Sequence, residues 1–531
     1  MPCWFKYFVY IACFFSTTVH AAIPEIERNA LITLYNATSG DLWSDNAGWL
    51  GDPGTECQWQ GVSCSGGLHI TELTLSAKGL KGQIPEEISV LSQLQKLDLS
   101  GNNLSFGLPD TFVELSQLNY LDLRGNRSLG NILEIVTQLT QLRYLNLSNI
   151  GLNDVISSEI AHLSHLQELI LSSNALTGAL PAELGEVSQL KVLDLHLNQF
   201  NGVIPPELGD LSQLEILNLG VNYLSGGIPS ELGALSNLQE LHLGSNPLGG
   251  TIPEQLAELS QLKKLNLSFS LLSGEIPVGL AKLTQLTSLH LTNNSLSGSI
   301  PKELGQLSQL TRLRLLGNQL TGGIPSELGQ LSELIFLHFA DNQLTGTIPQ
   351  ELNQLSKLKV LRMSDNKLTG GLSHLNNLSD LVTLSLQNNC FNFGNYEFLA
   401  SLADLKYLDL GSQYSCQDTL KNEAIVRKGR RDDIHIPYIM LNGQAYEVTL
   451  ERYYGVGYQG NDIHWRVLET SVIETESELQ ENPSAEYDFA TGILRFNKIH
   501  LREQVLNAEL LPYTPPDYAE EGVYFKYVSA R

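Results

Sequence analysis

The chain has 531 residues and a formal net charge of −25, from 57 acidic and 32 basic side chains. A surface this acidic repels phosphate backbones and anionic lipid headgroups. The composition therefore argues against nucleic acid and anionic membrane surfaces as partners.

Residues 1–21 are organised like a secretory signal. A basic residue precedes an apolar run over residues 8–15, and a small-residue cleavage site follows at residues 19–21. The run is too short to span a bilayer, and no other stretch approaches the length of a membrane span. An alternative is lipidation at Cys13, because residues 10–13 loosely resemble a bacterial lipoprotein box. We predict an exported protein without a membrane span, which is secreted, periplasmic or at the cell surface.

Residues 22–69 are expected to cap the repeats that follow. Residues 26–35 have the apolar spacing of a helix, and Trp43, Trp49 and Trp59 lie near a pair of cysteines. We predict that the tryptophans plug the open apolar end of the first repeat. The alternative is an exposed sugar-binding platform.

A 24-residue phrase then recurs, most clearly over residues 214–237. Its frame is L-x-x-L-x-L-x-x-N-x-L-x-G-x-I-P-x-x-L-x-x-L-x-x, and its opening apolar residue recurs every 24 positions from Ile70 to Leu358. Leu381 and Leu405 open two less regular rounds. A strict period predicts a solenoid in which each coil rests on its neighbours, here about 14–15 coils over residues 70–416.

Each phrase predicts a strand, a turn and a short helical segment. The alternating leucines of L-x-L predict a strand with one buried face. The Asn that follows can bond to backbone groups of the adjacent coil, each of which would cost roughly 1–3 kcal/mol if buried without a partner. Where Ser270 replaces this Asn, its hydroxyl can supply one such bond. The Pro of I-P favours an extended segment before it, and the P-x-E-L-G stretch predicts a turn of helix or 3₁₀ helix.

The frame resembles the leucine-rich repeat, in the plant-specific subtype marked by L-x-G-x-I-P, over about two thirds of the chain. Residues 30–64 similarly resemble the N-terminal cap of plant-type repeats, including the C-x-W-x-G-V-x-C ending. The resemblance implies an α/β fold, namely a right-handed solenoid with a concave parallel β-sheet and a second strand on the convex side.

Four cysteines remain once the signal is removed: Cys57, Cys64, Cys390 and Cys416. An even count in an exported chain suggests disulfides, and the two pairs flank the solenoid, where an end coil has no neighbour to cover its core. We predict the disulfides Cys57–Cys64 and Cys390–Cys416. No His/Cys cluster with ligand spacing accompanies them, so we predict no metal and no cofactor.

The coils differ mainly at the second, fourth and sixth places after each opening Leu, which should face solvent on the concave side. Acidic residues occupy the fourth place mostly in the first half of the solenoid, and His or Arg in the second half. Adjacent strands lie ~4.8 Å apart, so side chains from neighbouring coils should form one patch. This arginine patch consists of His290, Arg312, Arg314, Phe336, His338 and Arg362.

The arginine patch predicts a site for an anionic group, such as a peptide carboxylate or an acidic saccharide. The planar fork of Arg fits a carboxylate with two hydrogen bonds. Arg312-Leu313-Arg314 also resembles the R-x-R pair with which some plant repeat receptors hold the free C-terminus of a peptide hormone. The alternative is that these charges only keep the surface soluble.

The coils that open at Leu118 and Leu142 lose the G-x-I-P phrase, and Ile150 replaces the Asn. Tyr120 and Tyr144 should face inward there. We expect either a locally distorted pair of coils or a second contact region.

The period ends after Cys416. Residues 417–433 form a charged linker, and residues 434–531 carry a repeat of their own with an offset of 60 residues. Alternation at period two, aromatic enrichment and the hairpin-turn dipeptide at residues 442–443 predict a small all-β domain with two related halves. Residues 487–496 loosely resemble small tandem β modules of exported bacterial proteins.

We predict that the chain is not an enzyme, because it has no G-x-S-x-G, no H-E-x-x-H and no phosphate-cradling loop, and its solenoid glycines are expected to serve turns. The expected function is recognition of a protein, peptide or polysaccharide ligand on the concave face. One alternative is an inhibitor of a secreted hydrolase, like the plant polygalacturonase inhibitors that have this repeat. Another is a structural or adhesive surface spacer.

Overall fold

The computed structural model describes residues 23–66, 68–391, 401–402 and 404–409, and the backbone of seven strands between residues 433 and 530. The predicted signal, Cys416 and the predicted linker up to residue 432 lie outside the described residues. The chain divides into a first unit, Met1–Asp154 with His162–Ala175, and a second unit, Val155–Ala161 with Leu176–Arg531. The described strands include a sheet of 16 strands, the large sheet.

The cap of the first unit is built around buried aromatic rings. It comprises helix α1 (Glu25–Ala37) and the 3₁₀ helices η1 (Gly40–Leu42) and η2 (Glu56–Gln58). Trp43, Trp49 and Trp59 are 5%, 8% and 1% exposed. Their rings pack on one another, since the Trp49 centroid lies 4.8 Å from that of Trp43 and 5.1 Å from that of Trp59. The tryptophans are therefore core residues, and an exposed sugar-binding platform is ruled out for them.

A buried carboxylate joins this cap to the first repeat. Glu27 is buried and accepts a hydrogen bond from the backbone N–H of Ile70 at 2.9 Å. The predicted disulfide Cys57–Cys64 is present. Cys390 is also disulfide-bonded, and its pairing with Cys416 stays a prediction because Cys416 is outside the described residues.

Six strands of the large sheet belong to the first unit. They are β1 (Val62–Ser65), β2 (His69–Thr74), β4 (Lys96–Asp98), β6 (Tyr120–Asp122), β7 (Tyr144–Asn146) and β8 (Glu168–Ile170). Strand β1 is antiparallel to β2, and the others pair in parallel between residues 24 positions apart. The remaining elements are β3 (Lys81–Gly82), β5 (Asn103–Leu104), η3 (Glu86–Val90), η4 (Asp110–Glu114) and α2 (Leu133–Val136).

The two coils that lack G-x-I-P are regular on the sheet and irregular elsewhere. Tyr120 pairs with Tyr144 in the ordinary register. The short helix α2 stands where other coils have a 3₁₀ helix, and Ile150 is completely buried. The predicted distortion is therefore confined to the part of these coils that follows the strands.

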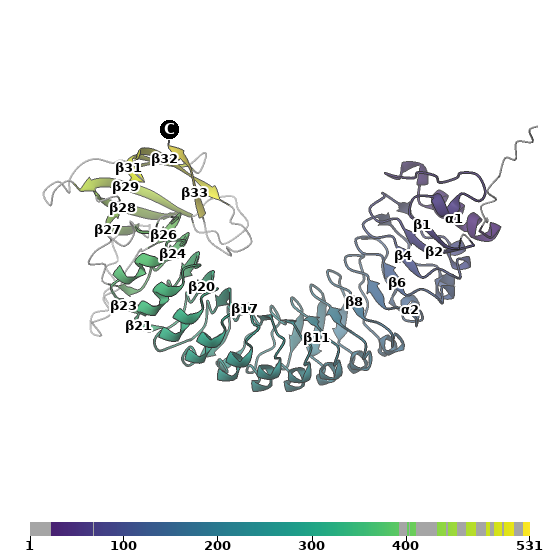
Figure 1. Ribbon diagram of the computed structural model, residues 1–531, viewed down its shortest axis with the longest axis horizontal. Coiled ribbons are helices and arrows are strands. Elements are labelled where there is room, and N and C mark those ends of the chain that lie inside the picture. Colours follow the sequence, from purple (N-terminus) through teal and green to yellow (C-terminus); the bar gives the residue numbers. More distant parts are fainter. Residues whose placement is uncertain are drawn as a thin grey trace, which may run out of the picture. The chain divides into compact units, whose positions relative to one another are not determined.

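Ten strands of the large sheet belong to the second unit. They are β10 (Val192–Asp194), β12 (Ile216–Asn218), β14 (Glu240–His242), β15 (Lys264–Asn266), β17 (Ser288–His290), β19 (Arg312–Arg314), β20 (Phe336–His338), β22 (Val360–Arg362), β24 (Thr383–Ser385) and β26 (Tyr407–Asp409). They run parallel in chain order. Within this unit they line the inner, concave side of the curve, and the 3₁₀ helices lie on the outer side (Figure 1).

The predicted second strand and 3₁₀ helix are both found in the second unit. The short strands are β9 (Thr177–Ala179), β11 (Gln199–Val203), β13 (Tyr223–Ser225), β16 (Ser273–Glu275), β18 (Ser295–Ser297), β21 (Thr345–Thr347), β23 (Lys367–Gly370) and β25 (Cys390–Phe391). The 3₁₀ helices are η6 (Ala182–Glu186), η7 (Pro206–Asp210), η8 (Ser230–Ala234), η9 (Glu254–Glu258), η10 (Val278–Lys282), η11 (Lys302–Gln306), η12 (Ser326–Gln330), η13 (Gln350–Gln354) and η14 (Ser373–Asn377). One further 3₁₀ helix, η5 (Ser158–His162), contains residues of both units.

Stacked leucines and the repeated Asn hold the coils together. The strand leucines, such as Leu217, are completely buried. Asn222 donates from Nδ2 to the carbonyls of Leu195 and Leu219, each at 3.1 Å, and its Oδ1 accepts from the N–H of Phe200 at 3.1 Å. The Asn thus satisfies backbone groups of two coils, as predicted. The Ser270 hydroxyl donates at 3.2 Å to the carbonyl of Ser268, which belongs to its own coil and not to the adjacent one.

The C-terminal strands form two antiparallel sheets. The first contains β27 (Asp433–Leu441), β28 (Gln444–Tyr453) and β29 (His464–Ile473), and the second contains β30 (Ala485–Asp488), β31 (Ile493–Leu501), β32 (Gln504–Tyr513) and β33 (Tyr524–Ala530). The pairing of β31, β32 and β33 repeats that of β27, β28 and β29 with an offset of 60, as Ile434 opposite Leu450 corresponds to Leu494 opposite Leu510. Among the described residues, no helix has the length and apolar character needed to cross a bilayer.

Candidate functional site

The concave face of the second unit presents its side chains in columns. Every strand of the large sheet has the same register here, so equivalent places of successive coils lie side by side. The fourth-place column begins with Asp194, Asn218, His242, Asn266, His290 and Arg314. The sixth-place column beside it begins with His196, Gly220, Gly244, Ser268 and Thr292. Because side chains two positions apart on a strand share a face, small sixth-place residues leave open space next to the fourth-place column.

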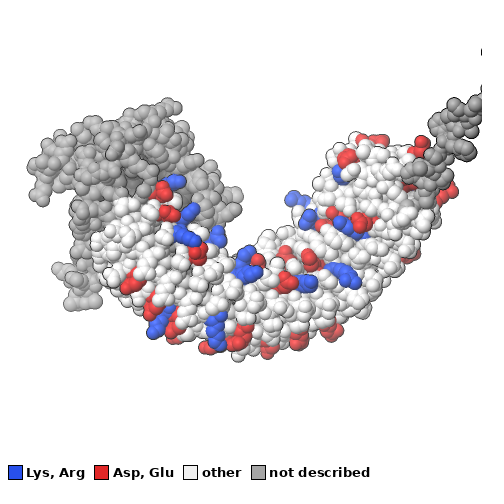
Figure 2. Space-filling view, in the orientation of Figure 1, with Lys and Arg blue, Asp and Glu red and all other residues white. Residues whose placement is uncertain are grey.

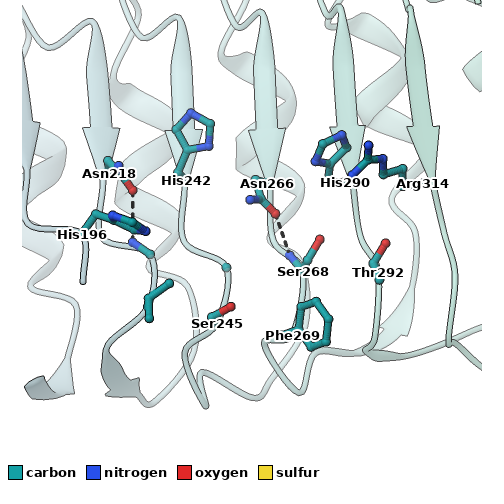
Figure 3. A pocket seen from close by; sticks show the side chains of 13 residues that line it. His196, Asn218, His242, Ser245, Asn266, Ser268, Phe269, His290, Thr292 and Arg314 are labelled. Carbon is teal, nitrogen blue, oxygen red and sulfur yellow. Dashed lines mark hydrogen bonds between the residues drawn. The ribbon is translucent and has the colours of Figure 1, made fainter. Parts of the chain in front are cut away.

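This space is a hollow of about 280 Å³ that runs across strands β12 to β19 (Figure 3). It is lined by His196, Asn218, Gly220, Val221, His242, Gly244, Ser245, Asn266, Ser268, Phe269, His290, Thr292 and Arg314.

Two glycines create the hollow. Gly220 and Gly244 occupy the sheet face, and neither has a positive φ, so their backbone angles do not require glycine. At Gly244, however, a Cβ would lie 2.9 Å from the carbonyl oxygen of Ser268, so the close approach of the adjacent coil does require glycine there. A Cβ on Gly220 would lie no closer than 3.3 Å to another atom. The expectation that the solenoid glycines serve turns is therefore wrong for Gly220 and Gly244. Consecutive small residues in the sixth-place column were the signal that could have found the hollow.

The floor of the hollow is formed by neutral polar groups. Asn218 accepts a hydrogen bond from the N–H of Gly220 at 3.3 Å, and Asn266 accepts one from the N–H of Ser268 at 3.1 Å (Figure 3). These bonds hold each carboxamide by its oxygen. No residue described in the structure accepts a hydrogen bond from the Nδ2 of Asn218 or Asn266. The two amide groups can therefore donate to a ligand.

A small charge network lies beside this floor. His242 contacts Glu240 through Nε2 at 3.1 Å, and Lys264 donates to the other carboxylate oxygen of Glu240 at 2.9 Å. Burial by itself would raise the pKa of Glu240, but the hydrogen bonds from Lys264 and His242 outweigh it and lower that pKa. Glu240 is therefore ionised and occupied by its own neighbours.

The structure brings all six residues of the predicted arginine patch together on β17, β19, β20 and β22. His290 is opposite Arg314, Arg312 is opposite Phe336, and His338 is opposite both Arg314 and Arg362. His290 and Arg314 also line the hollow, so the patch and the hollow overlap.

Four of the six patch residues are buried, contrary to the expectation that they point to solvent. Arg314, Phe336, His338 and Arg362 are 4%, 1%, 7% and 7% exposed, whereas His290 and Arg312 are partly exposed. Adjacent strands are close enough for these side chains to cover one another. The Arg314 guanidinium lies 4.5 Å from the centre of the Phe336 ring, and that ring meets His338 edge-on at 5.9 Å.

The patch histidines are neutral at neutral pH. Burial, reinforced by the charges of Arg314, Arg312 and His242, lowers the pKa of His290 to about 3. Burial and the charges of Arg362 and Arg314 lower the pKa of His338 well below its ordinary value. The positive charge of the patch therefore comes from its arginines, and the histidines act as hydrogen-bonding groups, as His290 does with the hydroxyl of Ser288 at 2.9 Å.

Much of the acidic charge of the second unit lies away from this face. Glu207, Glu231 and Glu327 occupy the same place in three P-x-E-L-G stretches, in the first turn of their 3₁₀ helices. Figure 2 shows such acidic side chains in a row along the outer side of the second unit. The large negative charge of the chain is thus compatible with a basic end of the hollow.

The seventh place of each coil, here called the edge position, lies just beyond the sheet face and has a left-handed backbone. Its φ is positive in all fourteen coils of the described part of the chain: Ala77, Gly101, Gly125, Asn149, Ser173, Leu197, Val221, Ser245, Phe269, Asn293, Gly317, Asp341, Asp365 and Asn388. Only Leu197, Val221 and Phe269 of this set are large and apolar, and Val221 and Phe269 line the hollow. The repeat frame gives no signal for these residues, because the seventh place is neither one of its fixed leucines nor one of the solvent-facing places of the strand.

Among the residues described with side chains, no three His, Cys, Asp or Glu residues gather as they would around a metal ion. What the arrangement offers chemically is a set of carboxamide and imidazole groups, an apolar edge and an arginine end.

Two family models match the chain. One, described as leucine rich repeat, matches residues 69–127. The other, also described as leucine rich repeat, matches residues 165–187, 189–211, 213–235, 237–259, 285–307 and 309–331. No curated protein matches the chain.

Solved structures share the fold. The structure of a TDR receptor is 34% identical with a TM-score of 0.57, and the match covers 64% of this chain and 63% of that chain. The structure of PEPR1–AtPEP1 is 25% identical with a TM-score of 0.50, covering 73% and 75%. This chain thus spans less than two thirds of the length of the TDR receptor.

A bacterial structure is matched over nearly its whole length. A leucine-rich-repeat protein of Leptospira interrogans is 31% identical with a TM-score of 0.51, and the match covers 63% of this chain and 95% of that one. The repeat frame, the parallel sheet with its buried Asn residues, the matching family models and this relative all agree. The chain belongs to the leucine-rich-repeat family.

Proposed function

We propose that the chain binds an extended peptide, or an extended segment of a protein, in the hollow on the concave face of the second unit. The observation that carries the proposal is the hollow itself, which glycines open beside a row of carboxamide and imidazole groups. A carboxamide offers one donor group and one acceptor, the same pair as a peptide unit. The Nδ2 groups of Asn218 and Asn266 are placed to receive backbone carbonyls of a bound chain.

The length of the charged column suggests the length and direction of the ligand. From Asp194 to Arg314 the fourth-place column crosses five strand steps, or ~24 Å at ~4.8 Å per step. An extended chain advances ~3.3 Å per residue, so about seven residues fit. Asp194 favours the amino end or a basic side chain, and Arg314 favours an acidic side chain or the C-terminal carboxylate.

Arg312 is the side chain of the arginine patch best placed to meet that anionic group. It is partly exposed, and it forms no ion pair with any residue that the structure describes. It stands two positions before Arg314 on β19, on the same face of the sheet. A carboxylate bound to a guanidinium forms two charge-assisted hydrogen bonds. The six residues of the patch remain our proposed anion site on this reasoning.

The comparisons support a ligand-binding function in general terms. The TDR protein is described as a receptor, and PEPR1 is described together with AtPEP1. We extend from these to the proposal that this chain, too, recognises a ligand and does so outside the cell. The inhibitor and spacer hypotheses, and the absence of enzymatic activity, remain predictions from the sequence.

The proposal can be tested with a library of seven-residue peptides in two forms, with free and with amidated C-termini. We expect the full chain to enrich peptides with a free or side-chain carboxylate near one end. Arg312→Ala should weaken these peptides about tenfold, because a hydrogen bond to a charged group contributes about 1.5–3 kcal/mol. Lys357→Ala is the matched control, since Lys357 pairs with Glu333 and does not line the hollow.

Two results would contradict the proposal. One is equal peptide binding by the wild-type chain and Arg312→Ala. The other is the absence of any enriched peptide together with saturable binding to polygalacturonate, which would assign the face to an acidic polysaccharide.

A further inference from the structure

We infer that the edge of the hollow contains a notch for one apolar side chain of the bound peptide, with Val221 and Phe269 as its walls and Ser245 as its base. The inference rests on the proposed function, because it concerns the same hollow. It adds the chemical class of one ligand residue and the position of that residue in the ligand.

The backbone makes large side chains costly at the edge position. Val221, Ser245 and Phe269 have φ values of 54°, 58° and 56°. The left-handed region is unfavourable for residues with a Cβ, least so for Asn and Asp, and a β-branched residue such as Val is rarely found there. At this place, all coils other than those of Leu197, Val221 and Phe269 carry Gly, Asn, Asp, Ser or Ala.

Burial in the core does not explain the large side chains either. Leu197, Val221 and Phe269 are 45%, 39% and 49% exposed. They stand outside the stack of completely buried leucines and leave apolar surface in water. Phe106 and Leu271 likewise combine a positive φ with high exposure and lie away from the hollow. At Val221 and Phe269 it is therefore their place in the lining of the hollow that points to contact with a partner.

The three coils form a notch because their edge residues alternate in size. Val221 and Phe269 are two coils apart, or ~9.6 Å at ~4.8 Å per coil, and the small Ser245 lies between them. That spacing admits one side chain in contact with both walls at ~4 Å. All three residues line the hollow, as Ser245 and Phe269 do in Figure 3. Gly244, next to Ser245, leaves the approach from the sheet face open.

The arginine end of the hollow fixes where the apolar residue stands in the ligand. Ser245 and Arg314 belong to coils three steps apart, which is ~14 Å across the strands. An extended peptide covers that distance in about four residues. The expected ligand therefore carries an aliphatic side chain about four residues before its acidic group, and its apolar side chain complements an edge that has no charge of its own.

The experiment uses seven-residue peptides with a free C-terminal carboxylate, in which a single Leu is moved through an Asn/Ser background. With the full wild-type chain, we expect one Leu position, about four residues before the carboxylate, to bind at least fivefold more tightly than the Leu-free peptide. Val221→Asn and Phe269→Asn should each abolish that preference, so that each variant binds the Leu peptide and the Leu-free peptide with equal affinity. Because Asn suits the left-handed backbone, each variant should also melt about 1–2 °C higher.

Two further variants separate the notch from general effects. Ser245→Leu fills the notch, so it should abolish the Leu preference without the rise in melting temperature. Val203→Asn is the matched control, because Val203 is 56% exposed on β11, has no positive φ and does not line the hollow. It should change neither the preference nor the melting temperature.

The outcomes distinguish the inference from the function on which it rests. Binding of the peptides without any preferred Leu position overturns the notch and leaves the proposed function standing. An unchanged preference in Val221→Asn and Phe269→Asn also overturns the notch, even if both variants melt higher. If no peptide of the set binds, both the notch and the proposed function are wrong.

Discussion

The sheet faces of the two units have the same frame and differ in what they do with their surface. In the first unit, the rings of Tyr120 and Tyr144 stack in parallel at 4.2 Å and 4°, and Lys96 Nζ lies 4.9 Å from the centre of the Tyr120 ring. In the second unit, Gly220 and Gly244 leave the hollow open. On the first face the side chains contact one another, whereas on the second the Nδ2 groups of Asn218 and Asn266 can still donate to a ligand. The repeat therefore sets only the register, and the side chains decide whether a face is closed or open.

The charged and polar side chains of the first face also find partners within that face. Asp122 is 1% exposed, accepts a hydrogen bond from the backbone N–H of Arg124 at 3.1 Å and lies 3.6 Å from the Nε of that arginine. Tyr144 accepts a hydrogen bond from the Nδ2 of Asn146 at 3.2 Å. The sequence left open whether these coils form a second contact region. Because their side chains contact one another, we interpret them as stabilising the fold.

Removing the tyrosine stack should have the largest effect. Tyr120→Ala deletes a half-buried ring together with its contacts to Tyr144 and Lys96, so we expect a loss of about 2 kcal/mol in the free energy of unfolding. Urea denaturation measures it. Tyr223→Ala, at a tyrosine that is 62% exposed, is the control and should change little. Weaker binding of the heptapeptides by Tyr120→Ala with no loss of stability would reverse the comparison.

The partly exposed imidazole of His290, on the second face, should make that face sensitive to acid. The pKa of His290 is about 3 in the folded chain and about 6.5 in the unfolded chain. The unfolded chain therefore takes up a proton first, and stability decreases as the pH falls from about 6.5 towards 3. The slope is at most about 1.4 kcal/mol per pH unit.

The matching variant is His290→Asn. We compare the free energy of unfolding of the variant with that of the wild type. Between pH 7.5 and pH 5.5 this difference should shift by about 1 kcal/mol in favour of the variant, as measured by urea denaturation at both values. Identical pH profiles for the two chains would show that His290 titrates normally and that this face is wetter than the structure indicates.

Partial filling of the hollow should affect binding more than folding. Gly220→Ala adds one methyl group at 3.3 Å from the carbonyl oxygen of Gly244, a tight contact that offsets part of the about 0.4–1 kcal/mol that Ala gains by restricting the unfolded chain. We expect unchanged or slightly higher stability and about fivefold weaker peptide binding. Gly371→Ala is the control, because a Cβ there meets nothing within 4 Å. Unimpaired binding by Gly220→Ala would move the site away from the hollow.

The smallest effect is expected at Asp122. Burial raises the pKa of this carboxyl, and Arg124 only partly offsets the rise. The folded chain therefore holds the proton more tightly than the unfolded chain, and the resulting stabilisation is lost as the pH rises through the folded pKa. Asp122→Asn keeps an acceptor for the N–H of Arg124 and should raise the melting temperature slightly at pH 7 and not at pH 3. A markedly lower melting temperature at pH 7 would mean that the ion pair with Arg124 stabilises the fold by more than burial of the Asp122 carboxylate costs.

The periodic part of the fold was predictable, because it depends on residue types that recur at fixed spacing. Leucines at period two indicate the strands, and the Asn that follows them indicates its own hydrogen bonds. Even the register of Arg312 opposite Phe336 follows from counting 24 residues. The Cys57–Cys64 disulfide followed from the need to close an end of the solenoid.

The hollow could not be predicted in the same way, because it consists of missing side chains and of backbone angles. Residue type alone does not distinguish Gly220 from the glycines of the turns, and only its position on the sheet face does. The left-handed angle at Val221 is invisible in a residue name. The charge of His290 depends on how deeply several neighbours bury it together, which no single position encodes.

The left-handed edge position also bears on how recognition can evolve in such a chain. At the edge position of each described coil, a substitution changes the surface without changing the stack of buried leucines. Every large residue accepted there subtracts roughly 1–2 kcal/mol from a net stability of only about 5–15 kcal/mol in typical domains. Stability therefore limits how many coils can hold a large residue at the edge position. New specificities can arise by substitution in the coils that have Asn or Gly there.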